Sequence, residues 1–179
     1  MRENLLKKKI QNGESAIGTF VKLTDPAVPE LLALAGFDFF VLDTEHVAVD
    51  REQLTNIVRA ADAAGITPIV RVRENQQVEI LQNLDEVLKV DGIDVIFIGP
   101  MDLSQSYGVP GKTTDPEVKA AIDTITAKTL AAGKAVGTTA ASAEAAKALI
   151  AKGVQYILLS SDEGIIVKWG KETISRIRG

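Results

Sequence analysis

The chain has 179 residues, of which 46% are hydrophobic and 25% charged, with a formal net charge of -4 and no cysteine. This length fits one globular domain that buries about 70% of the surface exposed by its unfolded chain. The lack of cysteine excludes a disulfide scaffold and a thiolate zinc site. The negative charge argues against nucleic acid, and no apolar run reaches the roughly 18 residues of a membrane span. We therefore expect a cytoplasmic protein with neither a nucleic-acid nor a membrane partner.

Short β-branched or aromatic runs alternate along the chain with alanine- and leucine-rich stretches that carry helix caps. This alternation is typical of a parallel sheet built from βα units. In chain order, strands are predicted over residues 16–23, 37–43, 66–72, 94–99, 134–139 and 155–160.

The helices between these strands have recognisable ends. Asp25 and Pro26 precede a helix that Gly36 closes, which is the usual asymmetry of proline at the start and glycine at the end. Asp50 and Gln53 form a capping-box-like start for the next helix. Further helices are predicted over residues 77–89, 116–133, 142–152 and 164–177, with a short opening helix at 5–10 and a long loop between 99 and 115.

Ligands of parallel α/β proteins bind at the carboxyl ends of the strands. His46 follows the second predicted strand and is the single histidine of the chain. Histidine is the residue type whose ordinary pKa suits a general base near neutral pH. The alternative is a surface histidine held by Asp43 or Glu45, and the sequence leaves both open. The last predicted strand ends in Ser160, followed by Ser161.

Two further charged residues are candidates for the same edge of the sheet. Arg71 lies within an apolar strand, where an unpaired guanidinium is costly to bury. It either pairs with an acid such as Asp43 or Glu45, or binds an anionic substrate such as a carboxylate. Asp102 follows a Gly-Pro pair, and it is either an oxygen ligand for Mg²⁺ or Mn²⁺ or a helix cap.

Three segments carry a resemblance to a known family: residues 40–46 (FVLDTEH), 70–72 (VRV) and 91–104 (DGIDVIFIGPMDLS). They resemble the HpcH/HpaI family of metal-dependent (class II) pyruvate aldolases, and the likeness covers nearly the whole chain. The resemblance implies a (βα)8 barrel that cleaves 4-hydroxy-2-oxo acids to pyruvate and an aldehyde, with a divalent metal that holds the pyruvate enolate.

The resemblance also assigns roles to individual residues. It implies that His46 is the base and that Asp43 supports it. Arg71 would contact the oxygens of a pyruvate-type small molecule, and Asp102 would be one of two carboxylate metal ligands. At the position of the second ligand, a Glu in the family, this chain has Gln76. An amide is a weaker ligand for a hard cation than a carboxylate. We therefore expect no cofactor, with Mg²⁺, Mn²⁺ or Co²⁺ required only if aldolase activity survives.

The length departs from the family pattern, because a (βα)8 barrel usually needs about 250 residues and eight strands. Matching both ends of this chain to the family places two missing βα units near residues 75–78. Without those strands an eight-stranded barrel cannot close in its usual way. We predict one α/β domain over residues 1–179, with six βα units in an open, doubly wound parallel sheet of flavodoxin-like or Rossmann-like type. An incomplete or smaller closed barrel is the alternative.

The loss of whole βα units indicates an engineered, shortened aldolase scaffold with little or no catalytic activity. The alternative is a working divalent-metal-dependent aldol lyase, supported by the survival of Asp43, His46, Arg71 and Asp102. A flavin or nucleotide module rests on fold-level analogy only, and the chain has no phosphate-binding loop. We also expect a homodimer that forms through exposed sheet edges.

Overall fold

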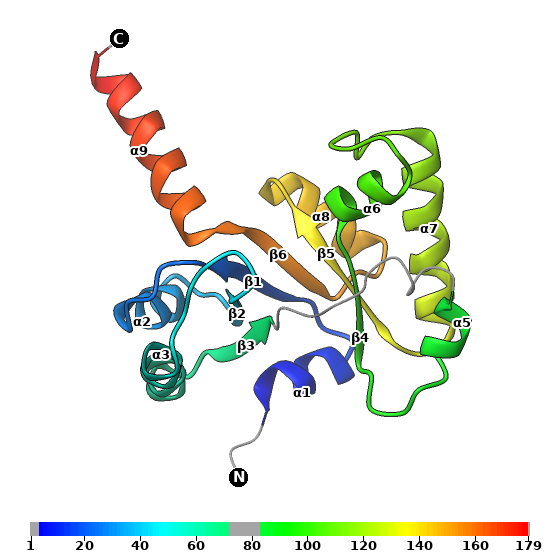
Figure 1. Cartoon of the computed structure of the whole chain (residues 1–179), viewed down its shortest axis with the longest axis horizontal. Coiled ribbons are helices and arrows are strands. Elements are labelled where there is room, and N and C mark those ends of the chain that lie inside the picture. Colours follow the sequence, from blue (N-terminus) through cyan, green and yellow to red (C-terminus); the bar gives the residue numbers. More distant parts are fainter. Residues whose placement is uncertain (1–3, 72–82, 179) are drawn as a thin grey trace. The chain divides into compact units, whose positions relative to one another are not determined.

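A computed structural model describes residues 4–71 and 83–178. In chain order its elements are α1 (Leu5–Gln11), β1 (Ala16–Val21), α2 (Ala27–Leu34), β2 (Phe39–Asp43), α3 (Arg51–Ala64), β3 (Thr67–Arg71), α5 (Leu84–Val87), β4 (Val95–Ile98), α6 (Pro100–Ser106), α7 (Pro116–Ala131), β5 (Ala135–Ala140), α8 (Ala143–Ala151), β6 (Tyr156–Ser161) and α9 (Asp162–Arg178) (Figure 1). All six predicted strands are present, with ends shifted by at most two residues.

The strands hydrogen-bond in the order β3-β2-β1-β6-β5-β4, and the pairs β1–β2, β2–β3 and β4–β5 are parallel. Because β3 and β4 are the two edges, the sheet is open, as predicted for this α/β fold. A Rossmann-like sheet has the order 3-2-1-4-5-6, with β4 beside β1. Here β6 lies beside β1, so the first and last strands are neighbours as in a closed barrel. The order is that of a barrel opened between β3 and β4. Of the two arrangements that the sequence left open, the strand order is that of the incomplete barrel rather than the Rossmann-like sheet.

The chain divides into two compact units. The first contains Met1–Leu6, Ala16–Arg73 and Leu159–Gly179, and the second contains Lys7–Ser15 and Glu74–Leu158. The first unit therefore holds β1, β2 and β3 with the end of β6, and the second holds β4 and β5 with the start of β6. The predicted deletion junction near residues 75–78 lies outside the described residues.

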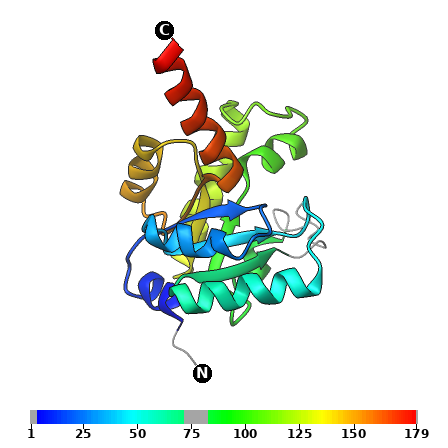
Figure 2. The same cartoon turned by 90° about the vertical axis from the view of Figure 1, so that its left-hand side faces the viewer.

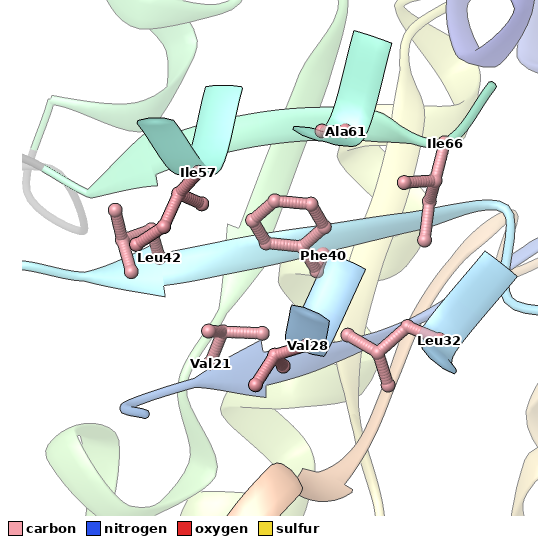
Figure 3. Packing of buried hydrophobic residues seen from close by; sticks show 8 residues of the cluster. All are labelled: Val21, Val28, Leu32, Phe40, Leu42, Ile57, Ala61 and Ile66. Carbon is pink, nitrogen blue, oxygen red and sulfur yellow. The ribbon is translucent and has the colours of Figure 1, made fainter. Parts of the chain in front are cut away.

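In the first unit, α2 and α3 cover one face of β1, β2 and β3 (Figure 2). Their apolar side chains meet those of the strands in one buried cluster, which leaves the opposite face of the strands for other side chains. The cluster consists of Val21, Val28, Leu32, Phe40, Leu42, Ile57, Ala61 and Ile66 (Figure 3).

Side chains of a strand alternate between its two faces. Since Phe40 and Leu42 belong to the cluster, Phe39 and Asp43 lie on the opposite face of β2. Gly18 of β1 gives the Phe39 ring room there, because a Cβ at Gly18 would lie 2.4 Å from a ring carbon. This second face of the strands carries the candidate site.

The predicted helix caps are confirmed in part: Asp25 accepts a hydrogen bond from the backbone N–H of Ala27, but Pro26 is the N-cap of α2 rather than its first residue. The Asp50 carboxylate accepts a hydrogen bond from the backbone N–H of Gln53, whose side chain completes the capping box of α3. Gly65 ends that helix with φ +81°, a left-handed conformation that favours glycine. Asp115 and Ser142 cap α7 and α8 through their side chains.

Two stretches differ from the prediction or are only partly described. Residues 99–115 were expected to form a loop, but they contain α6. Pro100 at the first helical position and the buried Leu103 explain this short helix. Of the helix predicted over residues 77–89, the described part contains α5.

Among the described residues, no helix combines the length and the apolar character needed to span a bilayer.

Candidate functional site

Strand register brings two of the predicted site residues together at the carboxyl ends of the strands in the first unit. Asp43, the last residue of β2, lies opposite Arg71, the last residue of β3. Val21 of β1 pairs with Leu42, so the next residue, Lys22, lies beside Asp43. Because side chains alternate, these polar residues lie on the face away from the α2–α3 cluster.

A pocket of about 360 Å³ opens at these strand ends. Asp43, His46 and Arg71, three residues named from the sequence, line it together. All lining residues belong to the first unit, and they come from the ends of β1, β2, β3 and β6 or directly follow these strands. The complete lining is Phe20, Lys22, Asp43, His46, Arg71, Ser160 and Ser161.

Asp43 is the acid among the residues that line the pocket. Its Oδ2 lies 2.9 Å from His46 Nδ1, while Oδ1 accepts hydrogen bonds from the backbone N–H groups of Glu45 and His46. The Asp43 residue is only 3% exposed, whereas the His46 side chain is 59% exposed. The interpretation of His46 as a histidine held by Asp43 is confirmed, and it agrees equally with a role as base.

The environment of Asp43 keeps its carboxylate ionised. Burial alone would raise the pKa of Asp43, but the hydrogen bonds from the ring and backbone of His46 outweigh it. The charges of His46 and Arg71 act in the same direction, so the pKa of Asp43 lies below its ordinary value. An ionised Asp43 accepts the proton on Nδ1 and thereby leaves Nε2 of His46 as the ring nitrogen that can take a proton.

Arg71 forms an ion pair with Glu45, with Nη2 and Oε2 2.5 Å apart. The Thr44 hydroxyl donates a hydrogen bond to the backbone carbonyl of Arg71, which ties the ends of β2 and β3 together. The predicted pairing of Arg71 with an acid is therefore confirmed. A guanidinium has five N–H donors, so the ion pair with Glu45 leaves donors of this pocket-lining residue for an anion.

Lys22 and Phe20 line the pocket although the sequence analysis did not single them out. Their position could have been predicted from the sequence, because alternation along β1 places Phe20 and Lys22 on the same face as Gly18. That face also carries Phe39 and Asp43 of β2. Lys22 Nζ donates a 2.8 Å hydrogen bond to Glu163 at the start of α9.

That contact with Glu163 raises the pKa of Lys22, against the opposing effect of burial. The negative charges of Asp43 and Asp162 also favour the protonated amine. The pocket therefore has a second cation besides Arg71.

Two serine residues at the end of β6, Ser160 and Ser161, also line the pocket. Ser160 has φ +54° and is the non-glycine residue with a positive φ in the described chain. Such a conformation costs free energy, and strained residues of this kind cluster at functional sites. Ser161 Oγ accepts a hydrogen bond from the backbone N–H of Gly164, which fixes the first turn of α9.

Asp43, Glu45 and His46 place three ligand atoms within 4.8 Å of one another, close enough to hold a metal ion. Each of these groups already has a partner, since Asp43 bonds to His46 and Glu45 pairs with Arg71. A metal ion bound through the same atoms would compete with these contacts. As arranged, the three residues fit a hydrogen-bonded base better than a metal centre.

The structure does not test the metal-ligand roles that the resemblance assigns to Asp102 and Gln76. Asp102 is exposed in the first turn of α6, within the second unit. Gly99 is the N-cap of that helix, so the interpretation of Asp102 as its cap is wrong. Gln76 lies outside the described residues. The ligand roles of Asp102 and Gln76 therefore stay predictions.

Comparison with known proteins agrees with the resemblance. The family model for HpcH/HpaI aldolase/citrate lyase matches residues 77–168, just over half of the chain. A hydroxypyruvate/pyruvate aldolase of Pseudomonas aeruginosa is 26% identical, with 98% of this chain and 93% of the relative covered. A 2-keto-3-deoxy-L-rhamnonate aldolase of Escherichia coli is 25% identical over 89% of this chain and 87% of its own.

Solved structures show the same relationship. The crystal structure of the citrate synthase SbnG is 28% identical and superposes with a TM-score of 0.89, covering 97% of each chain. An HpcH/HpaI aldolase from Desulfitobacterium hafniense gives a TM-score of 0.89 at 21% identity, over 97% of this chain and 96% of its own, which supports the fold alone. The chain belongs to the HpcH/HpaI aldolase/citrate lyase family.

Proposed function

We propose that this chain is a shortened aldolase-family scaffold whose pocket binds pyruvate-type 2-oxo acids, and that it has little or no carbon–carbon lyase activity. The observation that carries the proposal is the arrangement of the Asp43–His46 pair beside Arg71 in one pocket. A guanidinium binds the carboxylate of a 2-oxo acid, and an imidazole anchored at Nδ1 accepts a proton at Nε2. These are the binding and proton-transfer functions of an aldolase.

We propose that the chain fails at the cleavage step rather than at binding of the 2-oxo acid. Cleavage of a 4-hydroxy-2-oxo acid generates an enolate, whose negative charge needs strong electrostatic stabilisation. In the family that stabilisation comes from a metal held by two carboxylates, and the resemblance leaves only Asp102 of the two. In the Asp43–Glu45–His46 cluster the two carboxylates already contact His46 and Arg71, so a metal ion there would compete with these partners.

The proposed shortening has support from two observations. The alignment with the Pseudomonas aeruginosa aldolase spans 250 residues, whereas this chain has 179, so part of the relative has no counterpart here. The break in the cyclic strand order lies between β3 and β4, where the missing βα units are predicted. We propose that two whole units were removed deliberately. An unbroken natural gene that encodes this same chain would contradict that origin.

A working aldol lyase that uses Mg²⁺, Mn²⁺ or Co²⁺ is the second candidate. It is favoured by the names of the relatives, which are aldolases, and by the Asp43–Glu45–His46 cluster. In that case Asp43 or Glu45 would exchange its present partner for the ion.

A lyase assay separates the two candidates. Pyruvate release from a 4-hydroxy-2-oxo acid is measured with each metal in turn, for the unchanged chain and for His46→Ala. The scaffold proposal predicts release at the background rate for both chains. Metal-dependent release that disappears in His46→Ala would establish the lyase instead.

A further inference from the structure

The candidate pocket contains a cation that the binding of a single carboxylate does not need. In the proposed function, Arg71 binds the carboxylate of the 2-oxo acid. Lys22 lines the same pocket, and its side chain is 32% exposed, so it is open to a ligand. The acid among the lining residues, Asp43, offsets one of these two positive charges. The other charge is available for a second anionic group.

Lys22, Asp43 and Arg71 lie in one row across three neighbouring strands. Val21 of β1 pairs with Leu42 of β2, so the residues that follow them, Lys22 and Asp43, are also neighbours. Asp43 in turn pairs with Arg71 of β3. Because neighbouring strands are about 4.8 Å apart, the backbones of Lys22 and Arg71 are separated by about 10 Å. The two cations therefore flank Asp43 on the face that carries the pocket.

The existing contacts of Lys22 leave it able to bind a ligand. The oxygens of Asp43 bond to His46 and to backbone N–H groups, while Lys22 Nζ pairs with Glu163 at 2.8 Å. The side chain of Glu163 is 49% exposed, and ion pairs with exposed partners are weak because water competes for both charges. An ammonium has three N–H donors, so Lys22 keeps two of them while this pair is formed.

Ser160 adds a hydroxyl on the Lys22 side of the pocket, since β6 is the neighbour of β1 in the sheet. Its φ of +54° is a conformation that glycine adopts without strain and serine does not. Within residues 4–71 and 83–178, the Ser160 hydroxyl has no hydrogen-bond partner. A Cβ at Gly164 would lie 2.6 Å from Ser160 Oγ, so the glycine there leaves room for the hydroxyl. A strained residue whose hydroxyl does nothing for the fold indicates a role in binding.

The pocket has more room than pyruvate fills, because its volume is about 360 Å³. At the roughly 30 Å³ that a water molecule occupies in the liquid, the six non-hydrogen atoms of pyruvate take about 180 Å³. The ten non-hydrogen atoms of a five-carbon 2-oxo dicarboxylate take about 300 Å³. Its size therefore suits the larger compound.

The length of such a dicarboxylate also matches the separation of the two cations. Four C–C bonds of about 1.5 Å join its carboxyl carbons, which lie about 5 Å apart when the compound is extended. With a charge-assisted hydrogen bond of about 2.8 Å at each end, it spans about 10 Å. Side chains of a strand stand roughly perpendicular to the sheet, so the charged groups of Lys22 and Arg71 keep about the separation of their backbones.

On the basis of the proposed 2-oxo acid pocket, we propose that Lys22 and Ser160 form a second anion site, and that the chain selects short 2-oxo dicarboxylates over monocarboxylates. Arg71 binds the carboxylate beside the keto group, because its planar fork of donors matches a carboxylate. The ammonium of Lys22 and the hydroxyl of Ser160 bind the distal carboxylate. Lys22 is thereby a specificity-determining residue, since it adds affinity only for a ligand with a second negative charge.

Two compounds test this selection, 2-oxoglutarate and 2-oxopentanoate. They have the same five-carbon chain and the same keto group, and they differ in the distal carboxylate. Calorimetric titration of the unchanged chain is expected to give at least about 10-fold tighter binding of 2-oxoglutarate. Equal binding of the two compounds would overturn the second anion site and leave the 2-oxo acid pocket standing. Absent binding of both compounds would overturn the pocket assignment as well.

Substitutions of Lys22 assign the selection to its charge. Lys22→Met is expected to weaken binding of 2-oxoglutarate at least about 10-fold and to change binding of 2-oxopentanoate less than about 2-fold. Lys22→Arg keeps the charge and is expected to keep the preference. Lys147→Met, at an exposed lysine of α8 in the second unit, is the matched control and is expected to change neither affinity. A preference that survives Lys22→Met, or that Lys147→Met removes equally, would overturn the role of Lys22.

Ser160→Gly separates binding from stability. Glycine adopts a φ of +54° readily, so this variant is expected to unfold at the same urea concentration as the unchanged chain or at a higher one. Because it lacks the hydroxyl, it is expected to bind 2-oxoglutarate about 3-fold more weakly, with binding of 2-oxopentanoate unchanged. A loss of stability, or undiminished binding of 2-oxoglutarate, would overturn the role of Ser160. Circular dichroism of each variant establishes that it is folded.

Discussion

Replacing Asp43 by Asn tests the electrostatic core of the candidate site. The substitution keeps the size of the side chain and an oxygen for the backbone N–H groups of Glu45 and His46, but it removes the charge that faces His46 Nδ1. A hydrogen bond with a charged partner stabilises a protein by about 1.5–3 kcal/mol. Because the His46 side chain is 59% exposed, water competes for it, and we expect Asp43→Asn to lower the free energy of unfolding by about 1–2 kcal/mol at neutral pH.

The pH dependence follows from the lowered pKa of Asp43. The unfolded chain binds a proton at this position more readily than the folded chain does, so the stabilisation is complete above the ordinary carboxyl pKa of about 4. It is lost as the pH falls through the lower, folded-state pKa. The difference in stability between the unchanged chain and Asp43→Asn is therefore expected to shrink between about pH 5 and about pH 3.

Urea unfolding followed by circular dichroism at several pH values measures this difference. Asp91→Asn, at an exposed aspartate of the second unit, is the matched control and is expected to change stability little. A difference between the unchanged chain and Asp43→Asn that stays constant or grows on acidification would refute the reasoning.

Two further substitutions test the packing around the site. Phe40→Ala removes a fully buried ring from the α2–α3 cluster and is expected to cost about 3–5 kcal/mol in urea unfolding; a loss below about 1 kcal/mol would contradict the packing shown in Figure 3. Asp162→Ala leaves the backbone N–H groups of Lys22 and Leu23 without their acceptor and is expected to cost about 2–4 kcal/mol. Asp162→Asn keeps an acceptor oxygen and should lose about half as much, so equal losses for the two variants would argue against these hydrogen bonds.

The strands were predictable because each is a short apolar run between strong helix caps. Asp50 with Gln53 and the left-handed Gly65 fix the ends of α3 locally, and tertiary contacts do not shift them. The strand order was harder to predict from the sequence. Every βα unit looks alike in sequence, and the position of β4 depends on which neighbours remain to pair with it, so Rossmann-like and barrel-like orders stayed open.

The site was predictable to the extent that it depends on residues directly after strands. Asp43, His46 and Arg71 were found because polar groups at the carboxyl end of an apolar strand stand out. Lys22 was missed because a lysine after a strand is usually a solvated charge, and its contact with Glu163 joins residues far apart in the sequence.

The most direct test of the account is pyruvate binding, measured by saturation-transfer NMR and titration on the unchanged chain, on Arg71→Met and on Arg59→Met. Arg59 is an exposed arginine of α3 outside the pocket, so Arg59→Met makes the same chemical change there and serves as the control. The account predicts that the unchanged chain and Arg59→Met bind pyruvate equally, and that Arg71→Met binds at least about 10-fold more weakly, a difference of about 1.4 kcal/mol. Absent binding in the unchanged chain, or equal binding in all three chains, would contradict the assignment of this pocket to 2-oxo acids.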